Sequence, residues 1–520
     1  MSVLPANPDL DHLRRQARDL LRAARAGDAG ATGRISAVSD RLILASAQLA
    51  VARDYGFDSW PALKIEVEAR AQDLATFAAE FCRESVRGYH DKAVRMLAAR
   101  PELAGYSLAT QIVLGEAEPV RRALEADPGL VTRTDPATGW TALNAACASR
   151  WHKLDPARAG GLLAIAQMLL DAGADPDGGA GPARAGRGWN PLRCAVAGAA
   201  NPAIVRLLLD RGARPGDHEL YLAGFADDDH ECLCLLLAHT SEVSGVVLEA
   251  LAAPISQHDT EGVRLLLEAG ADPNKFVTDS DREAPVLHEA VQAGCGPALI
   301  ELLAGHGAEL EAAGPDGRTA YALAVSQGRS EVADVLRRHG ARADVSSADA
   351  LLSVLLRADR AAVDDQLDRR PGLLGELSAE QRGAGLTRAA ETGNVAAIGL
   401  MLDLGFSIET RGGDHGATAL HTAAYSGSAN VVQLLIERGA DIEAQDGNWD
   451  STAIVWAMIG SSERPGTNPE ADWLAVLAAL LDAGASTEGI EIDEDDDHPV
   501  SDAVAELLRR HGVPDRVDRP

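Results

Sequence analysis

Three aspartates between residues 364 and 368 have the spacing of a magnesium-binding motif. Asp364, Asp365 and Asp368 spell D-D-x-x-D, the arrangement that holds magnesium and diphosphate in enzymes that transfer prenyl groups. Residues four positions apart share one face of a helix, and carboxylate oxygens are ligands that suit magnesium. The stretch, however, belongs to a predicted helix whose exposed side is ordinarily charged, and no second acidic motif of the expected form accompanies it. The pattern therefore favours a solvated helix face over a metal site.

A second acidic cluster, residues 227–231, has the sequence D-D-D-H-E. Its carboxylates could bind a divalent cation through oxygen. They could equally cap the start of a helix, because aspartate accepts hydrogen bonds from free backbone N–H groups there and the helix dipole favours acids. We favour capping, and we keep Asp228 and His230 for the alternative pocket described below.

Cysteine chemistry and the familiar catalytic motifs are not indicated. The chain has no C-x-x-C pair, and its cysteines are scattered through predicted helices at positions 82, 147, 194, 232, 234 and 295. They are most simply buried, reduced thiols. G-x-S-x-G, Walker, G-x-G-x-x-G and H-E-x-x-H motifs are also absent. We therefore expect no cofactor and no metal, and any catalysis would have to be assembled from several distant segments.

The charge balance restricts the partners. The 520 residues carry 48 Lys and Arg against 78 Asp and Glu, a net charge of −30. A field of this sign repels a phosphate backbone and disfavours nucleic acid, whereas it favours basic or neutral partners. No apolar run approaches the roughly 18 residues of a membrane span, and the N-terminus lacks the build of a signal peptide. We expect a cytoplasmic protein without a membrane partner.

The elements that must position any site are clearest in residues 416–447. Gly416 opens a turn that leads into a helix, in which Ala423 and Ala424 are small enough for a neighbouring helix to approach closely. A second, apolar helix follows and ends at Gly439, where a left-handed residue closes a helix at low cost. A helix pair of about 33 residues cannot bury both of its sides alone. The unit therefore predicts neighbours on each side.

This unit closely resembles the T-P-L-H-x-A signature of the ankyrin family, with Ala419 in place of the proline. From Leu386 to Leu420, and from Leu420 to Ile454, the leucine-like position recurs after 34 residues. The other equivalents are Leu108, Leu143, Leu192, Leu220, Val247, Leu287, Tyr321 and Leu351. The resemblance implies an all-α solenoid of about eleven irregular ankyrin repeats with helical caps at both ends. The whole chain is also similar to an uncharacterised group of bacterial ankyrin-repeat proteins, which brings no established activity with it.

Departures from this period suggest a division of the chain. Helices that end at a proline, such as the one before Pro371, suggest that the array restarts near residue 345. We predict an N-terminal helical cap at 1–72, for which a separate recognition domain is the alternative. Repeats with insertions follow at 73–342, further repeats at 343–490, and an acidic linker with a capping helix at 491–520. Long insertions, functional or disordered, fall at 151–161, 178–188, 276–284 and 461–472.

The resemblance also implies structural roles for several polar residues. His288 and His421 occupy the histidine position of the signature, where the side chain commonly bonds to backbone across the repeat turn. Four threonines are expected to cap first helices, namely Thr141, Thr319, Thr418 and Thr452.

Aromatic residues are few, so their positions are informative. In ankyrin arrays the loops between repeats, called fingers, and the first helices line the concave surface, where partners usually bind. Exposed tryptophan and tyrosine are typical anchors there. The candidate binding residues are Trp140, Trp151, His152, Trp189, Tyr221, Asp228, His230, Tyr425 and Trp449. Each aromatic could instead pack between repeats, and for Trp456 we favour the core.

We predict a non-enzymatic scaffold that recognises a protein or peptide on the concave face. The alternative is an unorthodox enzyme or small-molecule-binding protein. Its pocket would be closed by insertions in 150–188 and lined by the candidates between Trp140 and His230. An open acidic trough supports the scaffold, whereas an enclosed cavity with a desolvated histidine or carboxylate supports the alternative.

Overall fold

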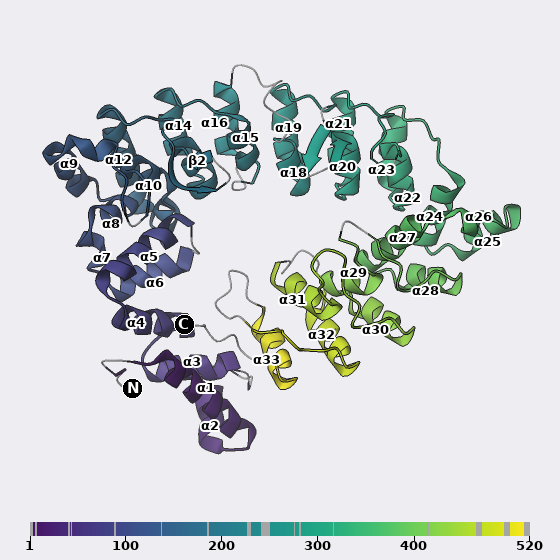
Figure 1. Cartoon of the computed structure of the whole chain (residues 1–520), viewed down its shortest axis with the longest axis horizontal. Helices are drawn as coiled ribbons and strands as arrows, with labels where there is room; N and C mark the ends of the chain where they lie inside the picture. The colour runs from purple at the N-terminus through teal and green to yellow at the C-terminus, as the bar shows by residue number, and fades with distance from the viewer. Residues whose placement is uncertain are drawn as a thin grey trace. The chain divides into compact units, whose positions relative to one another are not determined.

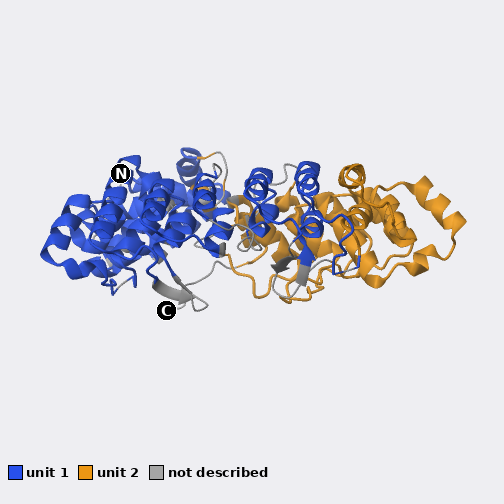
Figure 2. Cartoon of the chain, turned by 90° about the horizontal axis from the view of Figure 1, so that it is seen from above, with its two compact units in different colours: residues 1–38, 47–317 blue, residues 39–46, 318–520 orange. Residues whose placement is uncertain are grey.

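The structure is a computed structural model, and it divides the chain into two compact units (Figure 2). Unit 1 contains residues 1–38 and 47–317, and unit 2 contains residues 39–46 and 318–520. The residues described are all except 1–3, 6–7, 40–41, 43, 88–89, 137, 185–186, 226–229, 241–249, 275, 280–281, 316, 413–414, 464–470, 493–499 and 514–520. The predicted boundary near residue 342 stays a prediction.

Four helices precede the repeats. They are α1 (Leu10–Arg25), α2 (Ala29–Ser36), α3 (Leu44–Asp54) and α4 (Trp60–Ala71). Helix α1 packs against α2, and α4 packs against α6 of the first helix pair. The buried faces of α1 and α4 are formed by small and aliphatic side chains such as Leu13, Ala17 and Leu63. The last of these helices therefore contacts the first helix pair, and the cap at 1–72 stays a prediction.

Unit 1 continues as a row of antiparallel helix pairs (Figure 1). The pairs are α5 (Leu74–Arg87) with α6 (His90–Ala99), α8 (Leu108–Val113) with α9 (Ala117–Ala126), α10 (Ala142–Ala148) with α12 (Ala159–Asp171), α13 (Pro191–Arg193) and η3 (Cys194–Ala199) with α14 (Pro202–Asp210), α15 (Asp217–Ala223) with α16 (Glu231–His239), α18 (Ala252–Ser256) with α19 (Thr260–Glu268), and α20 (Val286–Gln292) with α21 (Pro297–Gly305). Short helices α7 (Leu103–Tyr106), η1 (Pro128–Val131), α11 (Trp151–Leu154) and η2 (Pro156–Arg158) lie in the connections.

Unit 2 has the same organisation. Its pairs are α22 (Ala320–Ser326) with α23 (Ser330–Arg338), α24 (Ser347–Leu356) with α25 (Arg360–Arg369), α27 (Ala379–Glu391) with α28 (Val395–Asp403), α29 (Ala419–Tyr425) with α30 (Ala429–Glu437), and α31 (Ala453–Glu463) with α32 (Trp473–Asp482). The short α26 (Leu373–Glu376) follows α25, and α33 (Asp502–Arg510) packs against α32. Each first helix contacts the first helix of the next pair. One continuous core, mainly of Leu, Val, Ile and Ala, consequently runs from α24 to α33.

Local chemistry explains where these helices begin and end. Thr141 and Thr319 accept hydrogen bonds from the backbone N–H groups of Asn144 and Ala322, as predicted for caps. Gly439 has a φ of 82°, the left-handed conformation expected after its helix. No helix in the described part of the chain has the length and apolarity needed to cross a membrane.

Two of the predicted insertions contain β-hairpins, which the sequence did not suggest. Strands β1 (Ala180–Arg184) and β2 (Arg187–Trp189) pair antiparallel, and so do β3 (Phe276–Asp279) and β4 (Arg282–Pro285). The Gly-, Ala- and Pro-rich β1 has little intrinsic strand preference. The pairing of β1 with β2 provides hydrogen-bond partners for backbone N–H and carbonyl groups of this finger.

Adjacent helix pairs approach at backbone contact distance. A Cβ atom added to Gly161 at the start of α12 would lie 2.0 Å from the carbonyl oxygen of Gly115. One added to Gly383 in α27 would lie 1.9 Å from the carbonyl oxygen of Arg411. Only glycine allows these contacts, because real Cβ atoms do not come within 3 Å of backbone.

We expect Gly161→Ala to destabilise unit 1 by about 1–3 kcal/mol, because the added methyl group forces α12 away from Gly115. Gly160→Ala is the matched control, since its Cβ would meet nothing within 4 Å. That change should be neutral or stabilising by up to about 1 kcal/mol, as for glycine in a helix. Urea unfolding of both variants checks this, and equal effects would contradict it.

Candidate functional site

A buried carboxylate organises the finger between α30 and α31. Asp446 is only 3% exposed. It accepts hydrogen bonds from the backbone N–H groups of Asn448 (2.8 Å), Trp449 (2.6 Å) and Ser451 (3.2 Å). The indole Nε1 of Trp456 donates to it at 2.9 Å. Asp446 thereby ties the finger to the first helix that follows.

These donors also keep Asp446 ionised. Burial by itself raises the pKa of its carboxyl. The hydrogen bonds from the backbone of Trp449, from the Trp456 indole and from the backbone of Asn448 and Ser451 outweigh burial, so the net pKa lies below the ordinary aspartate value. The negative charge is therefore present throughout the neutral range.

Aromatic rings gather above Asp446, and we call His415, His421, Tyr425, Trp449 and Trp456 the Trp449 cluster. The ring of Trp449 lies 4.4 Å from that of His415 and 6.0 Å from that of Trp456, centroid to centroid. Tyr425 and His421 each meet Trp456 edge-on, at 5.8 and 5.6 Å. Trp449 nevertheless remains 59% exposed. The cluster thus presents one rigidly backed indole to solvent.

Neighbouring fingers join beneath this cluster. The backbone N–H of Gly447 donates to the carbonyl of His415 at 3.0 Å, and the Asn448 amide meets the His415 ring at 3.2 Å. His421 bridges Thr418 and the carbonyl of Ser451, at 2.8 and 3.0 Å. The predicted structural role of His421 is confirmed by these bonds. His288, its counterpart in unit 1, is likewise buried, with its ring against Gly314.

In unit 1 the structure brings together two of the predicted tryptophans. The rings of Trp140 and Trp189, from successive fingers, lie 6.3 Å apart. The Asn144 amide donates to the carbonyl of Trp189 at 2.7 Å. Trp140 is 6% exposed and Trp189 is half-buried. The two rings therefore serve mainly to pack one finger against the next.

Tyr221 lies on α15 among other aromatic rings. It stacks with His218 at 6.0 Å and meets Phe225 edge-on at 5.0 Å. The same helix is joined to α13 of the preceding pair by a buried ion pair, in which Arg193 lies 2.9 Å from Glu219. Phe225, which lies just after the end of α15, is 46% exposed.

The insertion at 151–161 places Trp151 and His152 against the core. Trp151 is 3% exposed, and its Nε1 donates to the Ser85 hydroxyl at 2.9 Å. Its ring packs 6.0 Å from that of Phe81. His152 contacts the carbonyl of Ser149 at 3.2 Å, and burial lowers the pKa of its ring. Trp151 therefore anchors the insertion to α5.

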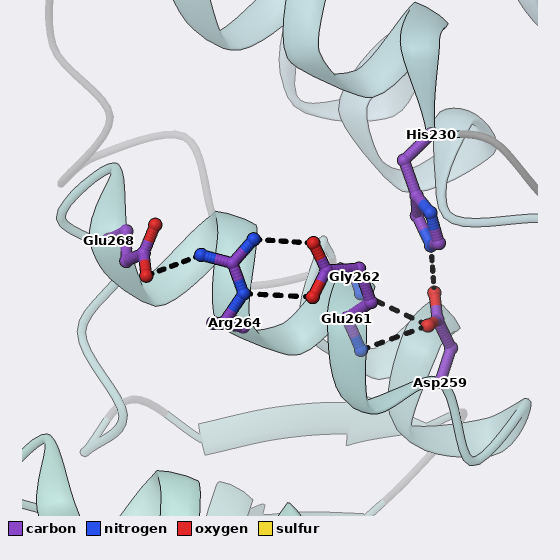
Figure 3. A network of polar contacts seen from close by, with 6 residues as sticks. All are labelled: His230, Asp259, Glu261, Gly262, Arg264 and Glu268. Atoms are coloured by element: carbon purple, nitrogen blue, oxygen red, sulfur yellow. Dashed lines mark hydrogen bonds and ion pairs between the residues drawn. The ribbon is translucent and has the colours of Figure 1, made fainter.

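His230 immediately precedes α16, and Figure 3 shows its ring facing Asp259. Its Nε2 contacts the Asp259 carboxylate at 2.6 Å. Asp259 in turn accepts the backbone N–H groups of Glu261 and Gly262 at the start of α19. This contact joins consecutive helix pairs at their inter-helix turns. Asp228 lies outside the described residues.

The remaining chemical motifs are engaged in other ways. Asp364 and Asp365 pair with Arg360 and Arg369 on the exposed side of α25, as the solvated-face interpretation predicts. The six cysteines are free, and Cys234 alone of them is exposed. Among the described residues, no group of three His, Cys, Asp or Glu side chains could hold a metal ion.

A sequence model of three ankyrin repeats matches residues 250–349 and 371–446. These two segments carry ankyrin repeats. The nuclear factor NF-kappa-B p105 subunit of Gallus gallus is 31% identical over 163 residues, which are 29% of this chain and 16% of that protein. This chain thus matches only a small part of that relative.

Two solved structures are similar to part of the chain. The human ASB11 ankyrin repeat domain is 23% identical, covers 45% of this chain and 98% of its own, and has a TM-score of 0.22. The ankyrin repeat domain of Bcl-3, a member of the IkappaB protein family, is 20% identical, with 44% and 97% covered and a TM-score of 0.21. Because these TM-scores are low, we do not transfer the position or role of any residue from these structures to this chain. The helix pairs and the match to the ankyrin sequence model support the predicted all-α ankyrin solenoid.

Two carboxylates in one finger provide a test of the site's framework. We expect Asp446→Asn to lower the free energy of unfolding of unit 2 by about 1–3 kcal/mol, because an amide cannot accept all four hydrogen bonds. The exposed neighbour Asp450 is the control. Asp450→Asn should change the free energy of unfolding by less than about 0.5 kcal/mol. Chemical unfolding measures both, and an equal effect would show that Asp446 does not organise the finger.

The buried ring of His421 predicts a dependence of stability on pH. Burial lowers the pKa of His421 in the folded state, so the unfolded chain binds the proton more tightly. The stability that the neutral ring contributes is present above the unfolded pKa of about 6.5 and is lost as the pH falls below it. We expect the stability difference between wild type and His421→Gln to shrink from pH 8 towards about pH 5. A constant difference would contradict the assignment.

Proposed function

We propose that this chain is a scaffold that binds a protein partner through an extended basic segment laid over the Trp449 cluster. Ankyrin repeats typically serve as protein–protein interaction scaffolds. Fold alone is a weak guide to function, so the choice of surface has to come from side chains. We infer that the fingers and first helices that carry this cluster form the binding face, because in ankyrin arrays these segments line the concave surface.

The observation that carries the proposal is the exposure of Trp449 in a fixed position. Exposing an indole to water is unfavourable, and a flexible finger could fold it away. Here three backbone hydrogen bonds to Asp446 and the contact with His415 hold the finger that presents it. A rigid, solvent-facing tryptophan binds at little cost in conformational entropy, which is typical of interface hot spots.

Charge supports a basic partner. The net charge of −30 attracts cationic segments over long range and speeds their encounter with the chain. The apolar contact with Trp449 then provides the anchor. Affinity for such a segment should fall as salt screens the long-range attraction.

The alternative of an enzyme or a small-molecule site in repeats 140–290 has weaker support. The predicted lining residues are divided between the Trp140–Trp189 pair, the core around Trp151 and the inter-helix turn at His230. A different hollow, next to Trp140, supports small-molecule binding and is considered below.

Selection from a random peptide library on the full chain, followed by fluorescence anisotropy, tests the proposal. We expect basic peptides to be enriched, and Trp449→Ala to weaken their binding by about tenfold or more, as for a hot-spot residue. Leu474→Ala is the matched control, because Leu474 is 43% exposed on the second helix α32 and should not affect binding.

Two outcomes would overturn the proposal. One is that the enriched peptides bind wild type and Trp449→Ala equally. The other is that they are acidic or that their affinity does not depend on salt. Circular dichroism of both variants ensures that a loss of binding reflects the missing ring.

A further inference from the structure

A hollow of about 200 Å³ lies in unit 1 between α5, α8 and the finger that leads to α10. Its walls include Cys82, Val86, Ile112, Val113 and Trp140, all less than 9% exposed. The more exposed lining residues, such as Thr134 and Pro136, belong to the finger. The hollow is therefore a largely apolar recess with a polar rim.

The volume of the hollow limits the size of the apolar part of a ligand. An apolar cavity of about 150 Å³ in another protein is large enough to bind benzene. At about 200 Å³, this one accommodates a single six-membered ring with a short side arm. The Cys82 thiol in the wall remains uncharged, because burial and the nearby Asp135 raise its pKa to about 12.

Most charges around the rim already have partners. Arg133 lies 2.7 Å from Asp127. Asp135 accepts the backbone N–H and the hydroxyl of Thr138, at 2.9 and 3.0 Å. Two acidic residues close to Arg83 on α5 also form ion pairs with a lysine.

These two acids are Glu80 and Glu84, and both pair with Lys92, at 2.9 and 3.1 Å. Arg83 itself is exposed, and it has no hydrogen bond or ion pair with any described residue. The chain has a net charge of −30, so a guanidinium without an acidic partner among the described residues is unusual at the rim of an apolar hollow. It selects for a ligand that carries an anion next to its apolar body.

We propose that this hollow is a binding site for a small aromatic carboxylic acid. The ring fills the recess against Trp140 and Ile112, and the carboxylate pairs with the Arg83 guanidinium at the rim. The site is separate from the Trp449 cluster and does not depend on the scaffold function. A ligand bound there would contact a finger and the first helices α5, α8 and α10, and would thus stabilise their mutual packing by mass action.

Isothermal titration calorimetry with phenylacetate, and with the neutral phenylacetamide, tests the proposal. We expect wild type to bind phenylacetate more tightly than phenylacetamide. Arg83→Gln should weaken the binding of phenylacetate by about two- to fivefold, as for loss of an exposed ion pair. It should leave the affinity for phenylacetamide unchanged. Arg122→Gln, which removes an exposed arginine on α9, is the control for net charge and should have no effect.

Filling the hollow provides the second arm of the test. Ala145 and Ala109 both line it and are partly buried. Ala145→Leu or Ala109→Leu should abolish binding of both ligands, and the two positions guard against one variant that fails to fold. The proposal is overturned if wild type binds neither ligand at millimolar concentration, if the filled variants bind normally, or if Arg122→Gln and Arg83→Gln have equal effects.

Discussion

The backbone of one repeat touches that of the next at positions where no side chain fits, and the stacking of both units depends on these contacts. Gly161 meets Gly115 in unit 1, and Gly383 meets Arg411 in unit 2. In unit 2, a Cβ atom on Gly460 would lie 2.1 Å from the carbonyl oxygen of Tyr425. A helix pair that cannot bury its own apolar faces is stable only when its neighbours come this close. The close approach of α31 to α29 is also what brings Tyr425 and Trp456 into one aromatic cluster.

The Trp449 cluster shows how a scaffold of this kind acquires a specific site. A buried charge is costly unless it is fully hydrogen-bonded, and Asp446 satisfies this condition with four donors from its own finger and the following helix. The free energy of those bonds fixes the backbone on both sides of Trp449. The finger that carries Trp449 is thereby held by hydrogen bonds on both sides of this residue. Loops fixed on a regular framework are where binding residues concentrate in repeat proteins.

Several features of the site could be predicted, and the reasons are local. His421 and the caps Thr141 and Thr319 follow from the repeat signature, because their partners lie within one turn or in the adjacent finger. Asp446 was not found, since an aspartate before glycine in a polar turn usually faces water. The burial of Trp151 was equally unpredictable, because its partners Ser85 and Phe81 are about 70 residues away in the chain. Contacts at that separation leave no periodic trace in the sequence.

The sequence by itself determined the helix pairs, their order and most of their ends. These depend on spacing between apolar residues and on caps, which act over a few neighbouring positions. Only the tertiary structure decided which aromatic residues are exposed. Trp140 and Trp449 both precede a first helix in sequence, yet one is 6% and the other 59% exposed. The difference comes from neighbouring fingers: Trp189 packs on Trp140, whereas His415 supports Trp449 and leaves much of its surface exposed to water.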